Sequence, residues 1–217
     1  MDETFDPIAV PGREPLSSDP LLSDSLPSDR GADLALLQRA STGDEHAFDE
    51  LYHRFETPLY NYILRLIHEP PVAEDLLQEV FVAAWNGASG FRGLSGVKTW
   101  LFHIAHNRTV SWLREHRRTL VYEDLRVSSE QDGPEQVLIQ ALSSERMKQA
   151  LDGLSPEHRA VVELAFYQDL PYSEIAAIIG CPVGTVKSRM SYARRYLNHL
   201  LRDLAQEEDL PPGQTKK

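Results

Sequence analysis

The stretch YSEIAAIIGCPVGTVKSRMSYARRYL, residues 172–197, decides the fold. Its first apolar residues follow the i, i+3, i+4 spacing of an amphipathic helix, which predicts a short helix over 173–179 that ends at Gly180. A helix of about eighteen residues follows Cys181-Pro182, with an apolar seam at Val186, Met190, Ala193, Leu197 and Leu200. A short helix, a glycine turn and a long basic helix make the helix-turn-helix arrangement.

The second helix is strongly basic: residues 181–202 carry five Lys or Arg and no acid. Most of these cations lie away from the apolar seam. A helix fits the DNA major groove, where a good bidentate pair of Arg with guanine contributes ~1–3 kcal/mol. A solvated basic face is the alternative, but the glycine turn and the short helix before it favour DNA binding. The candidate duplex-binding residues are Thr185, Lys187, Ser188, Arg189, Ser191, Arg194 and Arg195.

Helical spacing continues upstream, and the period-two alternation of strands is hard to find. Apolar positions predict a helix over 48–66 with a break or a kink at Thr57-Pro58. They also predict a helix over 72–85, a loop over 87–96 with glycine at every third position, and a helix over 98–117. Ser155-Pro156 opens another helix. The predicted fold class is therefore all-α, with two small helical domains.

The spacing also predicts which large apolar and aromatic side chains are buried. We expect Val72, Trp85, Trp100 and Trp112 in the core of the first half, and Ile179 in the core of the second half. Phe91, between Gly90 and Arg92 in the glycine loop, is the better candidate for an exposed ring.

Composition bounds the class of the protein. The chain has 217 residues with 33 acids and 22 Lys or Arg, a net charge of −11, and 41% apolar residues, which suffices for a buried core. One cysteine excludes a disulfide framework, and no run reaches the roughly 20 apolar residues of a membrane helix. MDETFDPIAV (1–10) lacks the pattern of a secretory signal, so a cytoplasmic protein is expected.

Known catalytic motifs are absent as well. We find no phosphate-binding glycine loop, HExxH or GxSxG, so we expect neither an enzyme nor a cofactor. His103 and His106 form a spaced pair without a third ligand at metal spacing, so no metal site is expected.

Charge is segregated along the chain, and this segregation predicts the domain borders. Residues 1–31 hold seven acids, two Arg and five prolines, so we expect a disordered acidic extension. We divide the rest into a first domain over 32–118, an acidic linker over 119–145, a second domain over 146–202 and a flexible tail over 203–217.

The basic block over 86–118 differs in kind from the C-terminal one, because aromatic residues lie in or beside it. Residues 86–118 contain six Lys or Arg and one acid. One stripe of the predicted helix carries His103, Asn107, Ser111, Arg114 and Arg118. Cations that track a backbone, with aromatics for stacking, are typical of single-stranded DNA binding. Stacking contributes roughly 1–3 kcal/mol per base, comparable to the free energy needed to flip a base out of a duplex.

An acidic stripe, Asp75, Gln78 and Glu79, faces away from the apolar side of the 72–85 helix. From the residues alone it is either a solvated helix face or a docking surface for a basic partner.

Three segments together resemble a known family. AEDLLQEVFVAAW (73–85) is similar to the polymerase-binding helix of bacterial sigma factors. GFRGLSGVKTWLFHIAHNRTVSWLREHRR (90–118) is similar to their promoter-melting segment, and residues 154–197 resemble their helix-turn-helix. With only these two domains and a short linker, the chain resembles the extracytoplasmic-function (ECF, group 4) class over about 32–202.

The resemblance implies a role for each surface. Asp75, Gln78 and Glu79 would contact the clamp helices of the β′ subunit of core RNA polymerase, and the second domain would contact the β flap. Phe91, Arg92, His103 and Asn107 would lie around a flipped base of the minus-ten element. Arg108, Arg114, Arg117 and Arg118 would hold phosphates of the melted strand. The candidate duplex-binding residues would read the minus-thirty-five element of promoter DNA, and an anti-sigma factor would be a further partner.

Two departures from the family pattern stand out. Pro171 occupies a position where many relatives have a Ser or Thr helix cap, and Ser191-Tyr192 replace longer basic or aromatic residues. The first weakens the cap, and the second prevents any transfer of a promoter sequence.

Two other functions compete with that of a sigma factor. A stand-alone helix-turn-helix regulator would have to bind duplex DNA unaided, which a net charge of −11 disfavours because phosphate neutralisation dominates affinity. A helical adaptor that never meets nucleic acid would leave the glycine turn and the basic helix unexplained.

Overall fold

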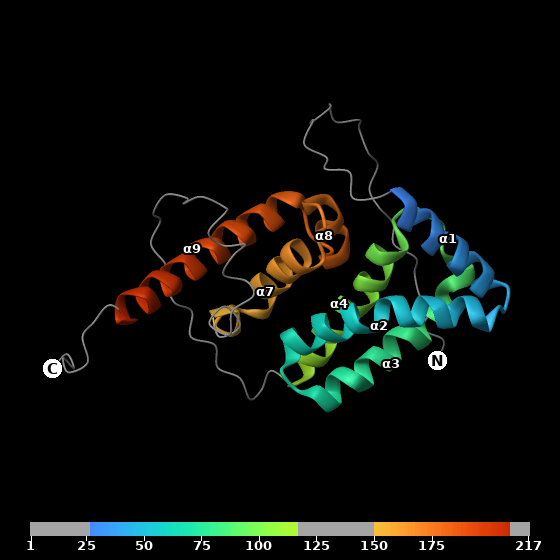
Figure 1. The fold of residues 1–217 in the computed structure, drawn as a ribbon, viewed down its shortest axis with the longest axis horizontal. Helices are drawn as coiled ribbons and strands as arrows, with labels where there is room; N and C mark the ends of the chain where they lie inside the picture. Colours follow the sequence, from blue (N-terminus) through green and yellow to red (C-terminus); the bar gives the residue numbers. More distant parts are fainter. Residues whose placement is uncertain (1–26, 117–149, 209–217) are drawn as a thin grey trace, which may run out of the picture.

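The computed structural model describes residues 27–116 and 150–208, with side chains over 30–116 and 150–200. These residues form helices without a strand among them, as the spacing predicts (Figure 1). The first half comprises α1 (Pro27–Ser41), α2 (Glu45–Ile67), α3 (Pro70–Gly87), the 3₁₀ turn η1 (Ala88–Gly90) and α4 (Val97–His116). The second half comprises α7 (Pro156–Val162), the π-helical turn η3 (Glu163–Tyr167), α8 (Tyr172–Ile179) and α9 (Val183–Glu208).

The first border differs from the prediction. Helix α1 begins at Pro27, so the last residues of the predicted 1–31 extension belong to a helix. That helix is held in place by Asp33, which is buried and pairs with Arg54 of α2. The rest of the extension, the linker over 119–145 and the end of the tail lie outside the described residues.

Helix α2 runs through Thr57-Pro58 without a break. Proline removes one backbone donor, but Phe55, Leu59 and Ile63 on either side are buried, and this burial holds the helix together. Asp44 caps its N-terminus by accepting a hydrogen bond from the Ala47 amide at 3.1 Å.

The core of the first half forms between α2, α3 and α4. Leu76, Leu77, Val80 and Phe81 form the buried side of α3, while Val72, which we expected in the core, is only half-buried. The expectation for the tryptophans is wrong: Trp85 is 38% exposed, and Trp100 and Trp112 are half-buried. Phe102 and Tyr62 fill the centre instead, with ring centroids 5.5 Å apart.

The second half packs α9 against both α7 and α8. Ile175, Val186, Met190 and Leu197 are buried along the predicted seams. Helix α8 begins at Tyr172, and its apolar face turns so that Ile178 rather than Ile179 is fully buried.

The turn between α8 and α9 has the predicted geometry. Gly180 adopts φ 71°, a left-handed conformation that glycine tolerates best. Pro171 occupies the N-cap of α8 without a side-chain hydrogen bond, because the proline side chain has no donor or acceptor atom. Helix α9 has 26 residues, more than the predicted eighteen or so, and reaches about 39 Å at 1.5 Å per residue.

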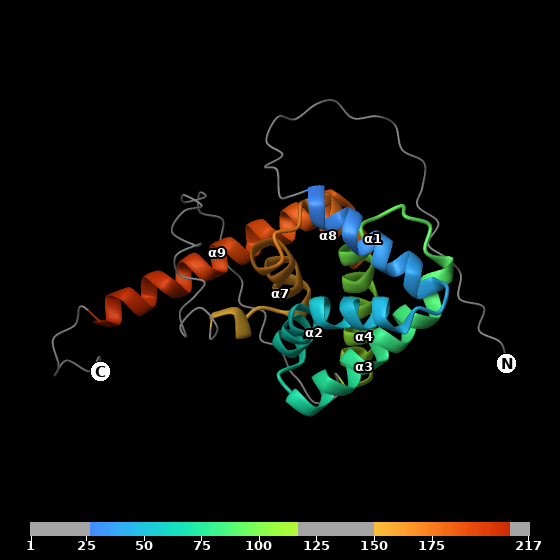
Figure 2. The ribbon, with the colours of Figure 1, turned by 45° about the vertical axis from the view of Figure 1, so that its right-hand side comes forward.

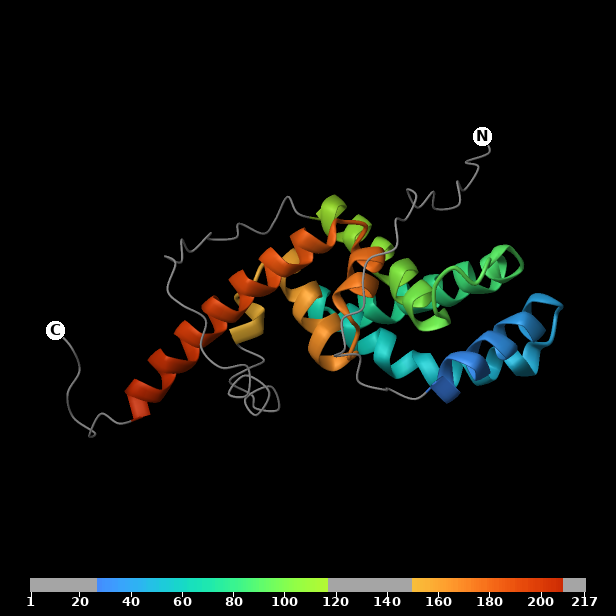
Figure 3. The same cartoon turned by 90° about the horizontal axis from the view of Figure 1, so that it is seen from above.

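The two halves contact each other directly. Helix α8 lies against α4, and α7 lies near the C-terminal end of α2, while α9 extends away from the rest (Figures 2 and 3). Nothing in the sequence predicts this contact.

Candidate nucleic-acid interface

The basic face of α9 begins one turn after the glycine turn. Lys187 and Ser188 are exposed, and Ser188 donates its hydroxyl hydrogen bond to the Thr185 carbonyl at 3.0 Å. Arg189 is half-buried on the same turn. These side chains occupy the N-terminal part of the helix, which is the part that a recognition helix inserts into the major groove.

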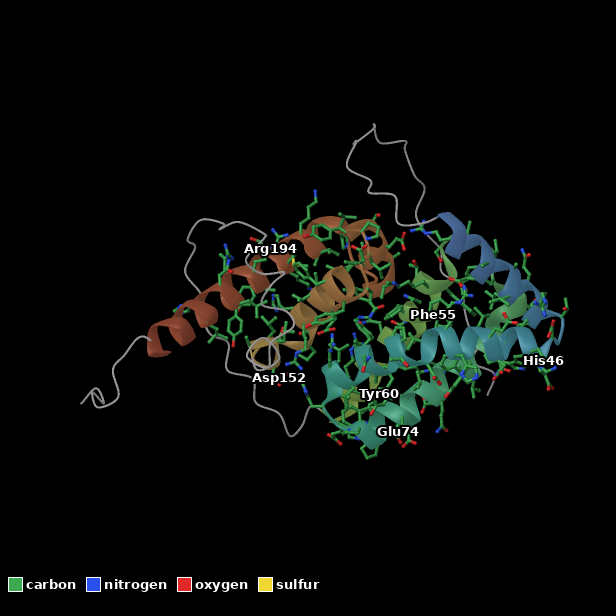
Figure 4. All side chains as sticks on the ribbon, viewed as in Figure 1. His46, Phe55, Tyr60, Glu74, Asp152 and Arg194 are labelled. Atoms are coloured by element: carbon green, nitrogen blue, oxygen red, sulfur yellow. The ribbon has the colours of Figure 1, made fainter. Side chains whose placement is uncertain are left out.

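The other candidates on α9 are less accessible than the helical spacing suggests. Ser191, Arg194 and Arg195 are all half-buried, as is Thr185. Arg194 lies on α9 (Figure 4) and donates to the Tyr172 hydroxyl of α8 at 3.4 Å. The structure therefore brings all seven candidates onto one helix and leaves Lys187 and Ser188 the most exposed of them.

Helix α4 carries the second basic surface. Asn107, Arg108 and Arg114 are exposed, whereas His103 is half-buried. His103 donates from Nδ1 to the Ile178 carbonyl at 2.9 Å, and its Nε2 accepts from the Asn107 side-chain amide at 3.0 Å. One neutral tautomer satisfies both hydrogen bonds. Arg117 and Arg118 lie outside the described residues.

The glycine loop differs from the prediction at its aromatic residue. Phe91 is half-buried and packs on Trp100, with ring centroids 5.1 Å apart, while Arg92 beside it is exposed. The exposed apolar residue of the loop is Leu94, at 77% exposure, next to Gly93 with φ 69°. Sequence reasoning missed Leu94, although a large apolar residue between two glycines was the available signal.

The acidic stripe on α3 is solvent-exposed as predicted. Asp75, Gln78 and Glu79 are exposed, and Glu79 lies 3.5 Å from Arg108 of α4. Val82, 61% exposed, and Trp85 continue the stripe toward the glycine loop. The surface thus joins exposed acidic groups to an exposed apolar end.

A buried polar pair lies beneath the α4 surface. Tyr62 donates its hydroxyl hydrogen bond to His106 Nδ1 at 2.8 Å, and both side chains are buried. Burial raises the pKa of the Tyr62 phenol, so it keeps its proton. Burial, with His103 and Arg189 nearby, lowers the pKa of His106 to about 4, so this imidazole is neutral at pH 7. Among the described residues no group of His, Cys, Asp or Glu has the geometry of a metal site.

An ionic cluster joins the two halves at the end of α2. Arg65 of α2 lies 2.6 Å from the Glu163 carboxylate of η3 and stacks over the Tyr167 ring at 3.7 Å. Burial raises the pKa of Glu163 to about 7 against the opposing effect of Arg65. The partners are separated by 98 positions in sequence, so no local pattern could have revealed the pair.

Arg159 of α7 completes this cluster. It is 2% exposed, and its guanidinium donates to the carbonyls of Leu151, Asp152 and Leu154 within the second half. It also donates to the Arg65 carbonyl at 2.8 Å and to the imidazole of His68, beyond the end of α2. Asp152, labelled in Figure 4, lies 3.6 Å from that imidazole.

Comparisons with protein families match both halves of the chain. The model of sigma-70 region 2 matches residues 51–119, and the model of sigma-70 region 4 matches residues 144–197. Of the described residues, no helix combines the length and the apolar character that crossing a membrane requires.

Characterised relatives match most of the chain. The RNA polymerase sigma factor YlaC of Bacillus subtilis is 34% identical over 169 residues, 75% of this chain and 96% of the relative. The RNA polymerase sigma-H factor of Pseudomonas aeruginosa is 29% identical over 81% of this chain and 96% of its own length. The ECF RNA polymerase sigma factor SigK of Mycobacterium tuberculosis is 30% identical over 77% of this chain and 92% of its own length.

Solved structures give the same result. CnrH in complex with the cytosolic domain of CnrY aligns with a TM-score of 0.60 at 25% identity, over 79% of this chain and 98% of that one. The sigma factor RpoE in complex with the anti-sigma factor NepR from Bartonella quintana aligns with a TM-score of 0.57 at 30% identity, over 71% and 96% of the two chains.

Proposed function

The chain belongs to the ECF class of bacterial RNA polymerase sigma factors, and on this premise we propose which of its surfaces meets each partner. It binds core RNA polymerase, directs it to specific promoters and helps to melt the minus-ten element. We place it in the cytoplasm, where polymerase and promoters are, and assign it no catalytic reaction of its own.

The acidic stripe of α3 is the proposed contact for the β′ clamp helices. Its carboxylates at Asp75 and Glu79 are exposed, and Val82 and Trp85 add apolar area beside them. The charged groups would orient the polymerase on α3 and speed its association, and burial of the apolar residues would provide most of the binding affinity. The second half is the proposed contact for the β flap.

The surface of α4 and the glycine loop is the proposed site for the melted minus-ten strand. Arg92, Arg108 and Arg114 are placed to neutralise phosphates, while His103 and Asn107 have the groups to bond a base edge. Phe91, packed on Trp100, supports the loop from below, and Leu94 extends from it. Arg117 and Arg118 belong to this site on the sequence pattern alone.

The N-terminal part of α9 is the proposed reader of the minus-thirty-five duplex. Lys187, Ser188 and Arg189 are the central contacts, and Thr185, Ser191, Arg194 and Arg195 flank them. The aligned RpoE structure is a complex with the anti-sigma factor NepR, and the aligned CnrH structure is a complex with the cytosolic domain of CnrY. The RpoE complex supports an anti-sigma factor as a further partner here.

One observation carries this proposal: region 2 and region 4 occur in order, and each presents its own basic surface. A stand-alone regulator would use the second surface only. Run-off transcription with purified core enzyme, on the upstream region of the chain's own gene, tests the proposal. We expect a discrete transcript only when the chain is added. Transcription that is the same without the chain would contradict this function on that template.

A further inference from the structure

Four large apolar side chains are exposed among the residues that the structure describes, and three of them belong to surfaces discussed above. Val82 and Trp85 continue the acidic stripe of α3, and Leu94 extends from the glycine loop. The fourth is Val183, the first residue of α9, with 40% of its surface exposed. Packing of the second half does not account for this residue, because the buried seam of α9 begins only at Val186.

Val183 occupies the part of α9 that a recognition helix presents to DNA. The helix begins directly after Pro182, whose carbonyl accepts hydrogen bonds from the Thr185 amide at 2.9 Å and the Val186 amide at 3.3 Å. Residues four apart on a helix are neighbours on one face, so Val183 lies one turn before the exposed Lys187. In a helix-turn-helix, the N-terminal residues of the recognition helix contact base edges in the major groove.

The chemistry of valine restricts what it can contact in that groove. Its side chain has no hydrogen-bond donor or acceptor, so it gains from contact with an apolar group only. The base edges of the major groove offer one such group, the C5 methyl of thymine. Contact between Val183 and this methyl removes both from water, which is favourable for each apolar group that is buried. The polar side chains of Lys187 and Ser188 on the next turn cannot provide this contact.

Gly184, the next residue, independently points to an external partner. It is helical, so its backbone conformation does not require glycine. Apart from its chain neighbours and its own helix backbone, no described atom lies within 4 Å of the position that a Cβ would take there. Glycine is also a poorer helix former than alanine. A missing side chain does permit the close approach of a ligand, and Gly184 is exposed.

From these observations we infer that Val183 is a specificity-determining residue that contacts the C5 methyl group of a thymine in the minus-thirty-five element. Gly184 allows the DNA backbone to approach α9 at the same turn. The inference rests on the proposed function of α9 as the reader of this duplex, and it adds an apolar contact to the polar contacts proposed there.

The test begins with the promoters that the full-length chain selects. Fragments of genomic DNA that core RNA polymerase retains only in the presence of the chain define the minus-thirty-five element. We expect this element to contain a position at which thymine is required. Retention of no fragment would contradict the proposed function itself, whereas an element without thymine on either strand would overturn this inference alone.

Uracil substitution then isolates the methyl group. Each thymine of the element is replaced singly by uracil, which keeps the base pair and lacks only the C5 methyl. We expect one such replacement to weaken binding of the wild-type holoenzyme about fourfold in competition gel shifts, which is the effect of losing one buried methyl group. Unchanged binding of every uracil duplex would overturn the inference, while transcription separately reports the proposed function.

Variants of Val183 assign the contact to this residue. Val183→Ala removes both methyl groups of the side chain and should bind the thymine and uracil duplexes equally, at the weaker affinity. Val183→Thr keeps one methyl group and should retain part of the difference. His199→Ala, exposed further along α9, is the control and should retain the full difference. Full discrimination by Val183→Ala would overturn the assignment to Val183.

Gly184→Ala tests the close approach and separates it from stability. Alanine is the better helix former, so the melting temperature in circular dichroism should equal or exceed that of the wild type. Promoter affinity of the holoenzyme should nevertheless fall several-fold. Gly31→Ala on α1 is the matched control, because a Cβ there also meets no described atom within 4 Å, and it should bind promoters normally. Wild-type affinity for Gly184→Ala would overturn the role of Gly184.

Discussion

Arg159 illustrates how one buried residue holds this molecule together. Its five N–H donors all find acceptors: three carbonyls in its own half, the Arg65 carbonyl and the imidazole of His68. A buried guanidinium is tolerated only when it is satisfied in this way. Spacing alone places Arg159 on a helix near a Ser-Pro cap and gives no sign of this role, because its acceptors are mostly backbone atoms.

Replacing Arg159 by lysine should therefore destabilise the fold. Lysine offers three donors and no planar fork, so at least two buried acceptors lose their partner. We expect a loss of about 3–5 kcal/mol in the free energy of unfolding, measured by urea denaturation. Arg108→Lys, on the surface of α4, should change it by less than about 0.5 kcal/mol. A loss below about 1 kcal/mol for Arg159→Lys would show that these bonds contribute little.

His106 predicts a pH dependence of stability. Its pKa is about 4 in the folded chain and near 6.5 when unfolded, so the unfolded chain binds more protons between these values. The free energy of unfolding should fall as pH drops from 6.5 to 4, by up to about 3 kcal/mol from this group. Glu163, with its pKa raised from 4.5 to about 7, acts with the opposite sign between pH 4.5 and 7.

Comparison with His106→Gln separates the two groups. Glutamine keeps an acceptor for the Tyr62 hydroxyl and does not titrate. The difference in unfolding free energy between wild type and variant should change across pH 4–6.5, while the contribution of Glu163 cancels. A difference that is independent of pH would mean that His106 is not held neutral by burial.

At the scale of elements, α3 carries the proposed contact with polymerase. Charge reversal at Asp75 and Glu79 together should weaken binding to core enzyme, because it replaces two exposed carboxylates by cations on the proposed docking surface. We expect a loss of tenfold or more, measured by titration of labelled chain with core enzyme. Glu50→Lys, exposed on α2, should bind normally. Normal binding of the charge-reversed variant would show that the stripe is a solvated helix face and not the docking surface.

Helix α9 carries the proposed duplex contact. Lys187→Ala should lower promoter occupancy by the holoenzyme about tenfold, since a good groove contact contributes ~1–3 kcal/mol. Melting the minus-ten region beforehand should not rescue this loss, because the two surfaces act separately. His199→Ala, on an exposed position three turns further along, is the control. Equal promoter occupancy for Lys187→Ala and His199→Ala in gel shifts would show that Lys187 does not belong to the duplex-binding face.

Helical periodicity predicted the helices and their buried sides well, but it predicted the exposure of individual large side chains poorly. The seam Val186, Met190, Ala193 and Leu197 is buried as predicted because spacing determines which side of a helix is apolar. Spacing does not determine how far a large side chain is covered, so the exposure of Trp85 and the half-burial of Phe91 came only from tertiary packing.

The same limit applies to the candidate site. The acidic stripe and the cations of α4 and α9 could be placed from sequence, because charge on one helical face is a local pattern. The bonds between His103 and Ile178 and between Arg65 and Glu163 could not, since their partners are far apart in sequence and on different halves.

At the scale of the whole molecule, net charge limits what the free chain can bind alone. The chain has a net charge of −11, and duplex affinity depends on neutralising phosphates. The contact of α8 with α4 also engages His103, whose Nδ1 donates to the Ile178 carbonyl. This charge favours a chain that binds its promoter only as part of a larger complex.

The most direct measurement is the affinity of the chain for a fluorescent promoter fragment, determined by anisotropy with and without core polymerase at fixed salt. The account predicts weak, unselective binding by the chain alone and tight, promoter-selective binding once core enzyme is present. Tight and selective binding by the chain alone, with no gain from core enzyme, would contradict it.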